Sequence, residues 1–170
     1  MKTRLVRAID CVLHFARREN GGALAELAIL VPFLVIMLAA VAEFGRYFEN
    51  YTTLAKATRA SARYLSNHTY SQEEQDKAKN LVACGQLAAC GTDKLVKGID
   101  ASNVCIEYFY PAGSPKPETV TVSIPYDAGG GCGAPYTFTP IFDIGALLHN
   151  SFSLALPISP STTMYYMLDN

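Results

Sequence analysis

The residue whose type and position most clearly suggest a chemical role is Glu26. It is the only charged side chain in a stretch of 21 residues from Gly22 to Ala42. A carboxylate inside a membrane-spanning helix costs up to about 2.5 to 3.5 kcal/mol at the bilayer centre and less near an interface, so it usually has a partner or a function. The simpler alternative is that Glu26 reaches the lipid headgroups at the nearer membrane face. A basic pair, Arg17 and Arg18, precedes the stretch. A glycine pair, Gly21 and Gly22, lies at its beginning.

Cysteines form the second group with evident chemistry. Four of the five lie after the apolar stretch, and an even number favours disulfides in an oxidising compartment. Four cysteines allow three pairings. We favour Cys84 with Cys90, because this pair would close a short loop that contains glycine. The other two, Cys105 and Cys132, could then tie a predicted strand to a Gly-rich loop.

The sequence contains no recognisable catalytic arrangement. The Gly-rich stretch 128–133 lacks the Lys-Ser/Thr pair of a phosphate-binding loop. No GxSxG motif occurs, and no pair of carboxylates is placed for acid–base chemistry. Metal binding is disfavoured because there is no CxxC motif and the three histidines lack ligand-like spacing. We therefore expect no enzyme activity, no cofactor, no metal and no small-molecule substrate.

Charge is divided unevenly by the apolar stretch. Residues 1–21 carry five basic and two acidic side chains, a net of +3, whereas the remainder carries nine basic and thirteen acidic, a net of −4. Basic residues beside a spanning segment favour the cytoplasmic side, which places the N-terminus inside and residues 43–170 outside. As a helix the stretch would be about 31 Å long, which matches a bilayer core. The acidic exported part also disfavours a nucleic-acid partner.

The elements that position these residues begin with one long helix, expected from about Gly22 to Leu65. Beyond the apolar stretch, seven residues recur at spacings of four and three, as on one helix face. They are Phe44, Phe48, Tyr51, Ala55, Thr58, Ala62 and Leu65. The outer half of this stripe is expected to pack on the domain's own sheet. A coiled-coil dimer is disfavoured, since Ala and Thr are weak seam residues.

A second helix and a small sheet are expected downstream. The capping-box pattern of residues 71–74 predicts the start of the helix, and Cys84-Gly85 predicts its end. Alternating residues predict strands at 104–109 and 119–124, separated by a Pro-rich turn. A last strand is predicted at 161–167. Weaker candidates are strands at 136–142 and 152–156, with a helical turn at 145–148. The predicted fold class is α+β, with the long helix packed on an antiparallel β-sheet.

Three interpretations of the N-terminal segment remain open. The first is an uncleaved membrane anchor. The second is a secretory signal, because Ala40-Val41-Ala42 fits a cleavage site that would release a soluble protein beginning at Glu43. The long hydrophilic leader and the sixteen-residue uncharged core, residues 27–42, disfavour this second reading. In the third, a cut falls before the apolar run, on the cytoplasmic side.

The third interpretation coincides with a family resemblance. The basic leader, Gly21, four small or apolar residues, Glu26 and the long apolar run resemble a type IV prepilin processing site. More narrowly, residues 21–66 are similar to the N-terminal region of TadE-like minor pilins, or pseudopilins, of the tight-adherence (Tad, Flp) type IV pilus systems. In that family the peptidase cuts after the Gly five residues before the Glu, here Gly21, leaving Gly22 as the new N-terminus. One position departs from the family, which usually has an aromatic residue where this chain has Leu27.

The resemblance also implies roles and partners. Arg17 and Arg18 would orient the leader, and Glu26 would pair with the new α-amino group of a neighbouring subunit. The implied division is a leader at 1–21, the transmembrane half of the helix at 22–43 and a pilin-like periplasmic domain at 44–170. The implied partners are a prepilin peptidase, other minor pilins, the major pilin and the lipid of a bacterial inner membrane. The alternative is a soluble or membrane-anchored exported binding module or enzyme without a filament role.

Overall fold

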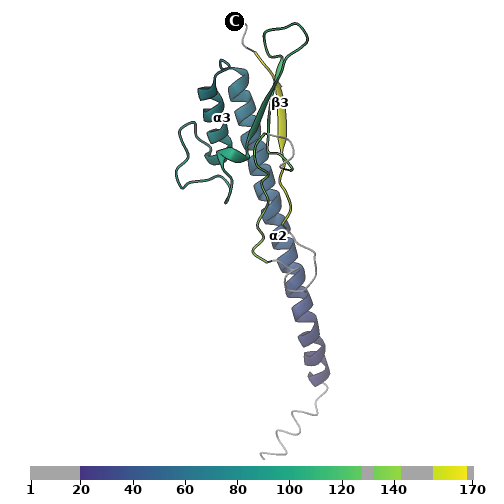
Figure 1. Ribbon diagram of the computed structural model, residues 1–170. Helices are drawn as coiled ribbons and strands as arrows, with labels where there is room; N and C mark the ends of the chain where they lie inside the picture. The colour runs from purple at the N-terminus through teal and green to yellow at the C-terminus, as the bar shows by residue number, and fades with distance from the viewer. Residues whose placement is uncertain (1–19, 128–131, 143–154, 168–170) are drawn as a thin grey trace, which may run out of the picture. The chain divides into compact units, whose positions relative to one another are not determined.

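The computed structural model describes residues 20–127, 132–142 and 155–167 (Figure 1). The chain divides into two compact units, residues 1–42 and residues 43–170. In order, the elements are helix α2 (Asn20–Ser66), helix α3 (Gln72–Cys84), the short 3-10 helix η1 (Ala101–Asn103) and strands β1 (Cys105–Phe109), β2 (Thr119–Ser123) and β3 (Ser161–Tyr165). The α+β class predicted from the sequence is therefore confirmed.

Helix α2 is continuous over its whole predicted length. It contains Pro32, which cannot donate the usual backbone hydrogen bond but is tolerated in apolar, membrane-type helices. Among the described residues, α2 is the one helix long and apolar enough to cross a membrane. Every side chain from Gly22 to Leu38 is exposed, so nothing within the described chain covers this apolar surface.

Within the second unit, α2 presents one face to the sheet and to α3. The outer half of the predicted stripe is buried, as expected, with Thr58, Ala62 and Leu65 almost inaccessible to solvent. The inner half is not, because Phe44, Phe48 and Tyr51 are all exposed. At that end the face that points into the domain is instead the one that carries Glu43, Tyr47 and Leu54, which the sequence pattern did not single out.

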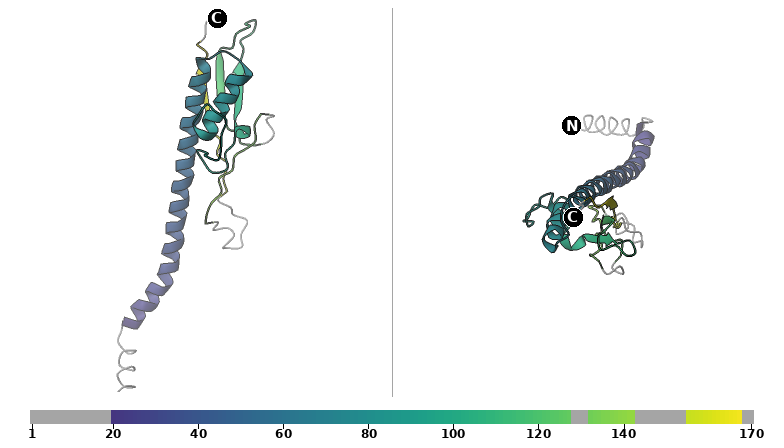
Figure 2. Two further views of the ribbon diagram at one scale, coloured as in Figure 1. Left: turned by 90° about the vertical axis from the view of Figure 1, so that its left-hand side faces the viewer. Right: turned by 90° about the horizontal axis from the view of Figure 1, so that it is seen from above.

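Helix α3 begins and ends where the sequence predicts. The Ser71 hydroxyl accepts a hydrogen bond from the Glu74 backbone N–H, and this cap satisfies one of the free donors of the first turn. Gly85 ends the helix in a left-handed conformation with φ 74°, which a residue with a side chain adopts only with strain. Figures 1 and 2 show α3 beside the last turns of α2. There the Ser61 hydroxyl donates to the Ala78 carbonyl at 2.9 Å.

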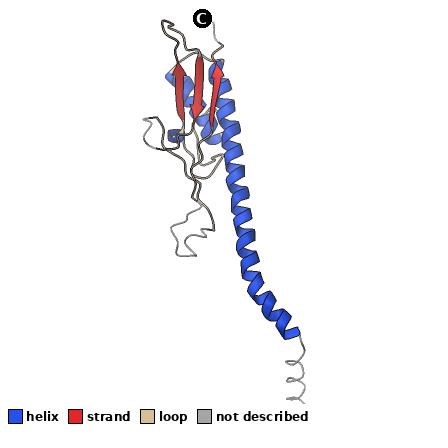
Figure 3. Ribbon diagram, turned by 90° about the vertical axis from the view of Figure 1, so that its right-hand side faces the viewer, coloured by secondary structure: helices blue, strands red, loops and turns tan. Residues whose placement is uncertain are grey.

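The sheet is antiparallel, with strand order β1-β2-β3, and lies side by side with the two helices (Figure 3). Tyr108 pairs with Val120, which pairs with Met164 on the far strand, so these three side chains share the face that meets the helices. The predicted last strand is two residues shorter than expected. Beyond Tyr165 the backbone N–H of Met167 donates to the Ser66 carbonyl at the end of α2.

One strand prediction was wrong. Residues 136–142 make only an isolated bridge, Thr137 with Pro157, instead of a strand. The reason is chemical, because Pro140 lacks the N–H that the next hydrogen-bonded position of a longer ladder would need. Most of the predicted strand at 152–156 and the predicted turn at 145–148 lie outside the described residues.

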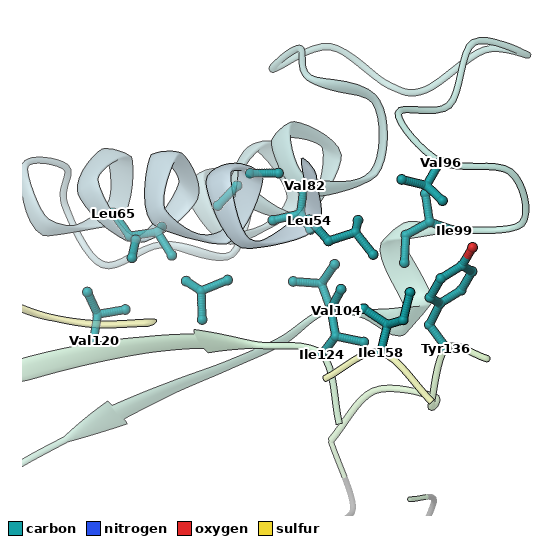
Figure 4. Close-up of a cluster of buried hydrophobic side chains, with 14 of the residues drawn as sticks. Leu54, Leu65, Val82, Val96, Ile99, Val104, Val120, Ile124, Tyr136 and Ile158 are labelled. Carbon is teal, nitrogen blue, oxygen red and sulfur yellow. The ribbon is translucent and has the colours of Figure 1, made fainter. Parts of the chain in front are cut away.

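A single apolar core joins the helices to the sheet. Leu54, Val82 and Ile124 are at most 1% exposed, and Figure 4 shows side chains from α2, α3 and the strands converging. Ile99 and Tyr136 extend the core toward the loops, where the Tyr136 hydroxyl donates to the Lys97 carbonyl at 2.8 Å. This core holds the strands against α2 without requiring any part of the apolar stretch before Glu43.

Three tyrosines cover the core at the C-terminal end of α2. Tyr108 lies between Tyr70, with ring centroids 4.8 Å apart, and Tyr166, at 6.2 Å. The Tyr166 hydroxyl donates to the His68 carbonyl at 2.6 Å. Burial raises the pKa of the Tyr108 phenol well above its ordinary value, and neighbouring tyrosines add to the effect. Burial likewise raises the pKa of Tyr166.

These phenols predict a loss of stability in alkali. The folded state keeps the Tyr108 proton above pH 10, where the unfolded chain releases it, so the free energy of unfolding falls as pH rises beyond about 10. Urea unfolding at a series of pH values, with tyrosinate absorbance recorded in parallel, measures this. The variant Tyr108→Phe should flatten the alkaline fall, whereas Tyr165→Phe, at a position 69% exposed, should not. Equal slopes for both variants would contradict the assignment.

Candidate processing and assembly segment

The predicted processing residues lie at the beginning of α2. The helix starts at Asn20, so the Gly21–Gly22 bond falls within its first turn. A Cβ added at Gly22 would meet no atom within 4 Å, which means that nothing in the fold requires glycine there. Arg17 and Arg18 of the predicted leader lie outside the described residues. The glycine at this position is thus free to serve recognition by another protein.

Glu26 lies one turn after Gly22, on the same side of the helix. Four residues correspond to about 6 Å along the axis, and side chains at this spacing face the same direction. The Glu26 carboxylate is exposed, and within the described part of the chain it takes part in no hydrogen bond or ion pair. Leu27, which follows it, is also exposed. A carboxylate left unpaired beside a wholly apolar surface is suited to a cationic partner supplied from outside the chain.

A second carboxylate, Glu43, is placed quite differently, and the sequence prediction missed it. Its side chain is 3% exposed, although it directly follows the apolar stretch. Oε1 accepts hydrogen bonds from the backbone N–H groups of Ile141 and Phe142, both at 2.9 Å. Oε2 forms an ion pair with Arg46 at 3.0 Å, one turn along the helix. The available sequence signal was the spacing of Glu43 and Arg46, three residues apart at the end of the apolar run.

Aromatic residues complete the surroundings of Glu43. The Arg46 guanidinium lies 5.5 Å from the centre of the Phe138 ring, within the range of a cation–π contact. Tyr47 packs edge-on against the same ring, with centroids 5.6 Å apart, and its hydroxyl donates to the Pro157 carbonyl at 3.2 Å. Segments 138–142 and 157–158 are therefore attached to the first turns of α2 inside the domain.

The disulfides pair as the sequence favours, Cys84 with Cys90 and Cys105 with Cys132. The first closes the loop after α3, and the second joins the start of β1 to the end of the Gly-rich stretch. Glu107 lies near the second pair, and these three residues are the one cluster of potential metal ligands among the described residues. Both sulfurs are bonded to each other, so neither is available as a thiolate ligand.

These features define an α+β protein whose helix α2 is long and apolar enough to cross a membrane. Residues 21–63 match the family described as TadE-like protein. The family resemblance predicted from the sequence is thereby confirmed over this segment. No curated protein and no solved structure matches the chain.

Proposed function

We propose that the protein is a minor pilin of a tight-adherence pilus, cut after Gly21 by a prepilin peptidase. The observation that carries the proposal is the TadE-like match, which begins at Gly21, the residue before the proposed scissile bond. The exposed Glu26, five residues later, supports it as well. In this role the protein takes part in initiating or capping the filament and catalyses no reaction.

Each N-terminal residue then has a distinct task. Arg17 and Arg18 hold the leader at the cytoplasmic face, where the peptidase cuts between Gly21 and Gly22. The new α-amino group of one subunit pairs with Glu26 of its neighbour as the helix moves from lipid into a helical assembly. The exposed apolar face of α2 before Glu43 supplies the assembly surface, and other minor pilins and the major pilin are the protein partners.

The same proposal fixes a location. The chain crosses a bacterial inner membrane once, with its N-terminus in the cytoplasm and residues from Glu43 onward in the periplasm. The charge difference across the apolar stretch supports this direction. Two disulfides in the second unit agree with an oxidising compartment.

The N-terminus of the mature protein tests the proposal directly. Peptide mass spectrometry on membranes of the native host should find a start at Gly22, and this start should disappear when the prepilin peptidase gene is deleted. The variant Gly21→Leu should block the cut. Gly45→Ala is the matched control, because Gly45 is another α2 glycine with open space around it.

The other outcomes each reject the proposal in a different way. A start at Glu43 would identify an ordinary secreted protein released after Ala42. An intact Met1 would leave only an uncleaved membrane anchor. A Gly22 start that persists without the peptidase would assign the cut to a different protease.

A further inference from the structure

Exposed apolar side chains surround the point where the second unit begins. Phe44 of α2 is 70% exposed, and Ile141 and Phe142 of the loop beside it are 69% and 56% exposed. We call these three residues the apolar collar. Large apolar groups gathered at one level of a protein surface usually mark a contact with another molecule or with lipid.

Glu43 holds two of the three collar residues in position. Its Oε1 atom accepts the backbone N–H groups of Ile141 and Phe142, so the loop backbone is fixed while both side chains remain outside. The carboxylate is itself covered by these contacts and by Arg46. A buried carboxylate with several donors costs little at the edge of an apolar medium, whereas an unpaired one would be expelled into water.

Sequence position sets the level of the collar along α2. Glu43 follows the last residue of the apolar stretch, Ala42, so it lies only about 1.5 Å farther along the helix. Phe44 lies one residue beyond it, and the hydrogen bonds to Glu43 bring residues 141 and 142 to the same level. If the 21 apolar residues fill the bilayer, the collar is at the boundary between acyl chains and headgroups.

We propose that the apolar collar inserts into this boundary of the lipid bilayer and forms a second membrane contact of the domain. This inference rests on the membrane anchoring in the proposed function. Lipid is the occupant because Glu43, which holds Ile141 and Phe142, directly follows Ala42, the last residue of the apolar stretch. Arg46, 40% exposed in its side chain, lies where a guanidinium can meet lipid phosphate.

Tryptophan fluorescence tests the proposal without background, because the chain contains no Trp. The full chain with Phe142→Trp would be reconstituted into vesicles of phosphatidylethanolamine and phosphatidylglycerol. Replacing these lipids by versions brominated on the acyl chains near the headgroup should quench the emission, which should also be shifted to shorter wavelength. The matched control is Phe109→Trp at the end of β1, a site that is also exposed and should show neither effect.

Two further variants separate the possible outcomes. Phe33→Trp, in the middle of the apolar stretch, reports anchoring itself, with lipids brominated near the ends of the acyl chains as its quencher. If it is quenched and Phe142→Trp is not, the anchor stands and the collar inference is overturned. If neither is quenched, both fail. A short-wavelength emission at position 142 without lipid quenching would show that a protein, such as a second copy of this chain, covers the collar, and this also overturns the proposal.

The variant Glu43→Ala, made separately in the Phe142→Trp and the Phe33→Trp chains, tests whether this carboxylate holds the collar in place. Without the carboxylate the loop loses both hydrogen bonds, and the quenching at position 142 should decrease while that at position 33 remains. Unchanged quenching at both positions would contradict a role for Glu43 in holding the collar.

Discussion

Replacing Glu26 by Ala is expected to leave the cut after Gly21 intact and to remove pili from the cell surface. In the proposed assembly the alanine variant leaves a neighbour's α-amino group without its carboxylate in apolar surroundings. Truncating one member of a buried charge pair costs about 2 to 5 kcal/mol at an interface. Since 1.4 kcal/mol is about a factor of ten in an equilibrium constant, incorporation should fall at least about tenfold.

The measurement combines two readouts on the same cells. Mass spectrometry of the N-terminus reports processing, and electron microscopy with quantification of sheared pili reports assembly. Glu26→Gln separates charge from size, because the amide keeps the shape but not the charge. Leu24→Ala is a control at an exposed neighbouring position. Normal piliation by a processed Glu26→Ala protein would refute an assembly role for this carboxylate.

Removing the Cys105–Cys132 disulfide should cost more stability than removing Cys84–Cys90. The two bonds span 27 and 6 residues, and a disulfide restricts the unfolded chain more when the loop it closes is longer. The chain-entropy relation gives about 3.6 kcal/mol for the longer loop and about 2.2 kcal/mol for the shorter one. The longer bond also joins β1 to the segment that leads into the core around Tyr136.

Urea unfolding of the two Cys→Ser double variants, in the full chain and the same detergent, measures this difference. Both proteins should remain folded at neutral pH, with Cys105→Ser/Cys132→Ser the less stable. Equal losses, or a greater loss from Cys84→Ser/Cys90→Ser, would show that local packing outweighs loop length in this domain.

Glu26 and Glu43 lie in or next to the same apolar stretch but have different surroundings. Both carboxylates flank or interrupt the same run of residues, but only one is satisfied inside the domain. Glu43 is covered by two backbone N–H groups and Arg46, whereas Glu26 is exposed and has no partner within the described residues. Glu43 is therefore suited to holding the loop at residues 141 and 142 against α2, and Glu26 to pairing with another subunit.

Local features of the chain were predictable from the sequence. The bounds of α3 follow from Ser71 and Gly85, because a cap and a left-handed turn depend on residues next to them. The strand pairing of β1 with β2 follows from alternation on both sides of a Pro-rich turn, and the registers agree with it. The continuity of α2 beyond its apolar stretch follows from the absence of Gly and Pro between Arg46 and Ser66.

Features that depend on distant contacts were not predictable. The stripe through Phe44, Phe48 and Tyr51 has the spacing of a buried face, but its side chains are exposed among the residues that the structure describes. Residues 136–142 have the composition of a strand, but Pro140 lacks the N–H that would extend the bridge at Thr137 into a ladder.

The sequence by itself determined the long apolar helix, its isolated Glu26, the acidic disulfide-bearing domain and the family resemblance, because each depends on residue types at short spacing. Only the tertiary structure decided that Glu43 is buried beneath residues 141 and 142, which are about 98 positions away along the chain. Such a contact is set by how α2, the sheet and the loops pack together around one core. The spacing of residues along the chain therefore does not predict the contact of Glu43 with residues 141 and 142.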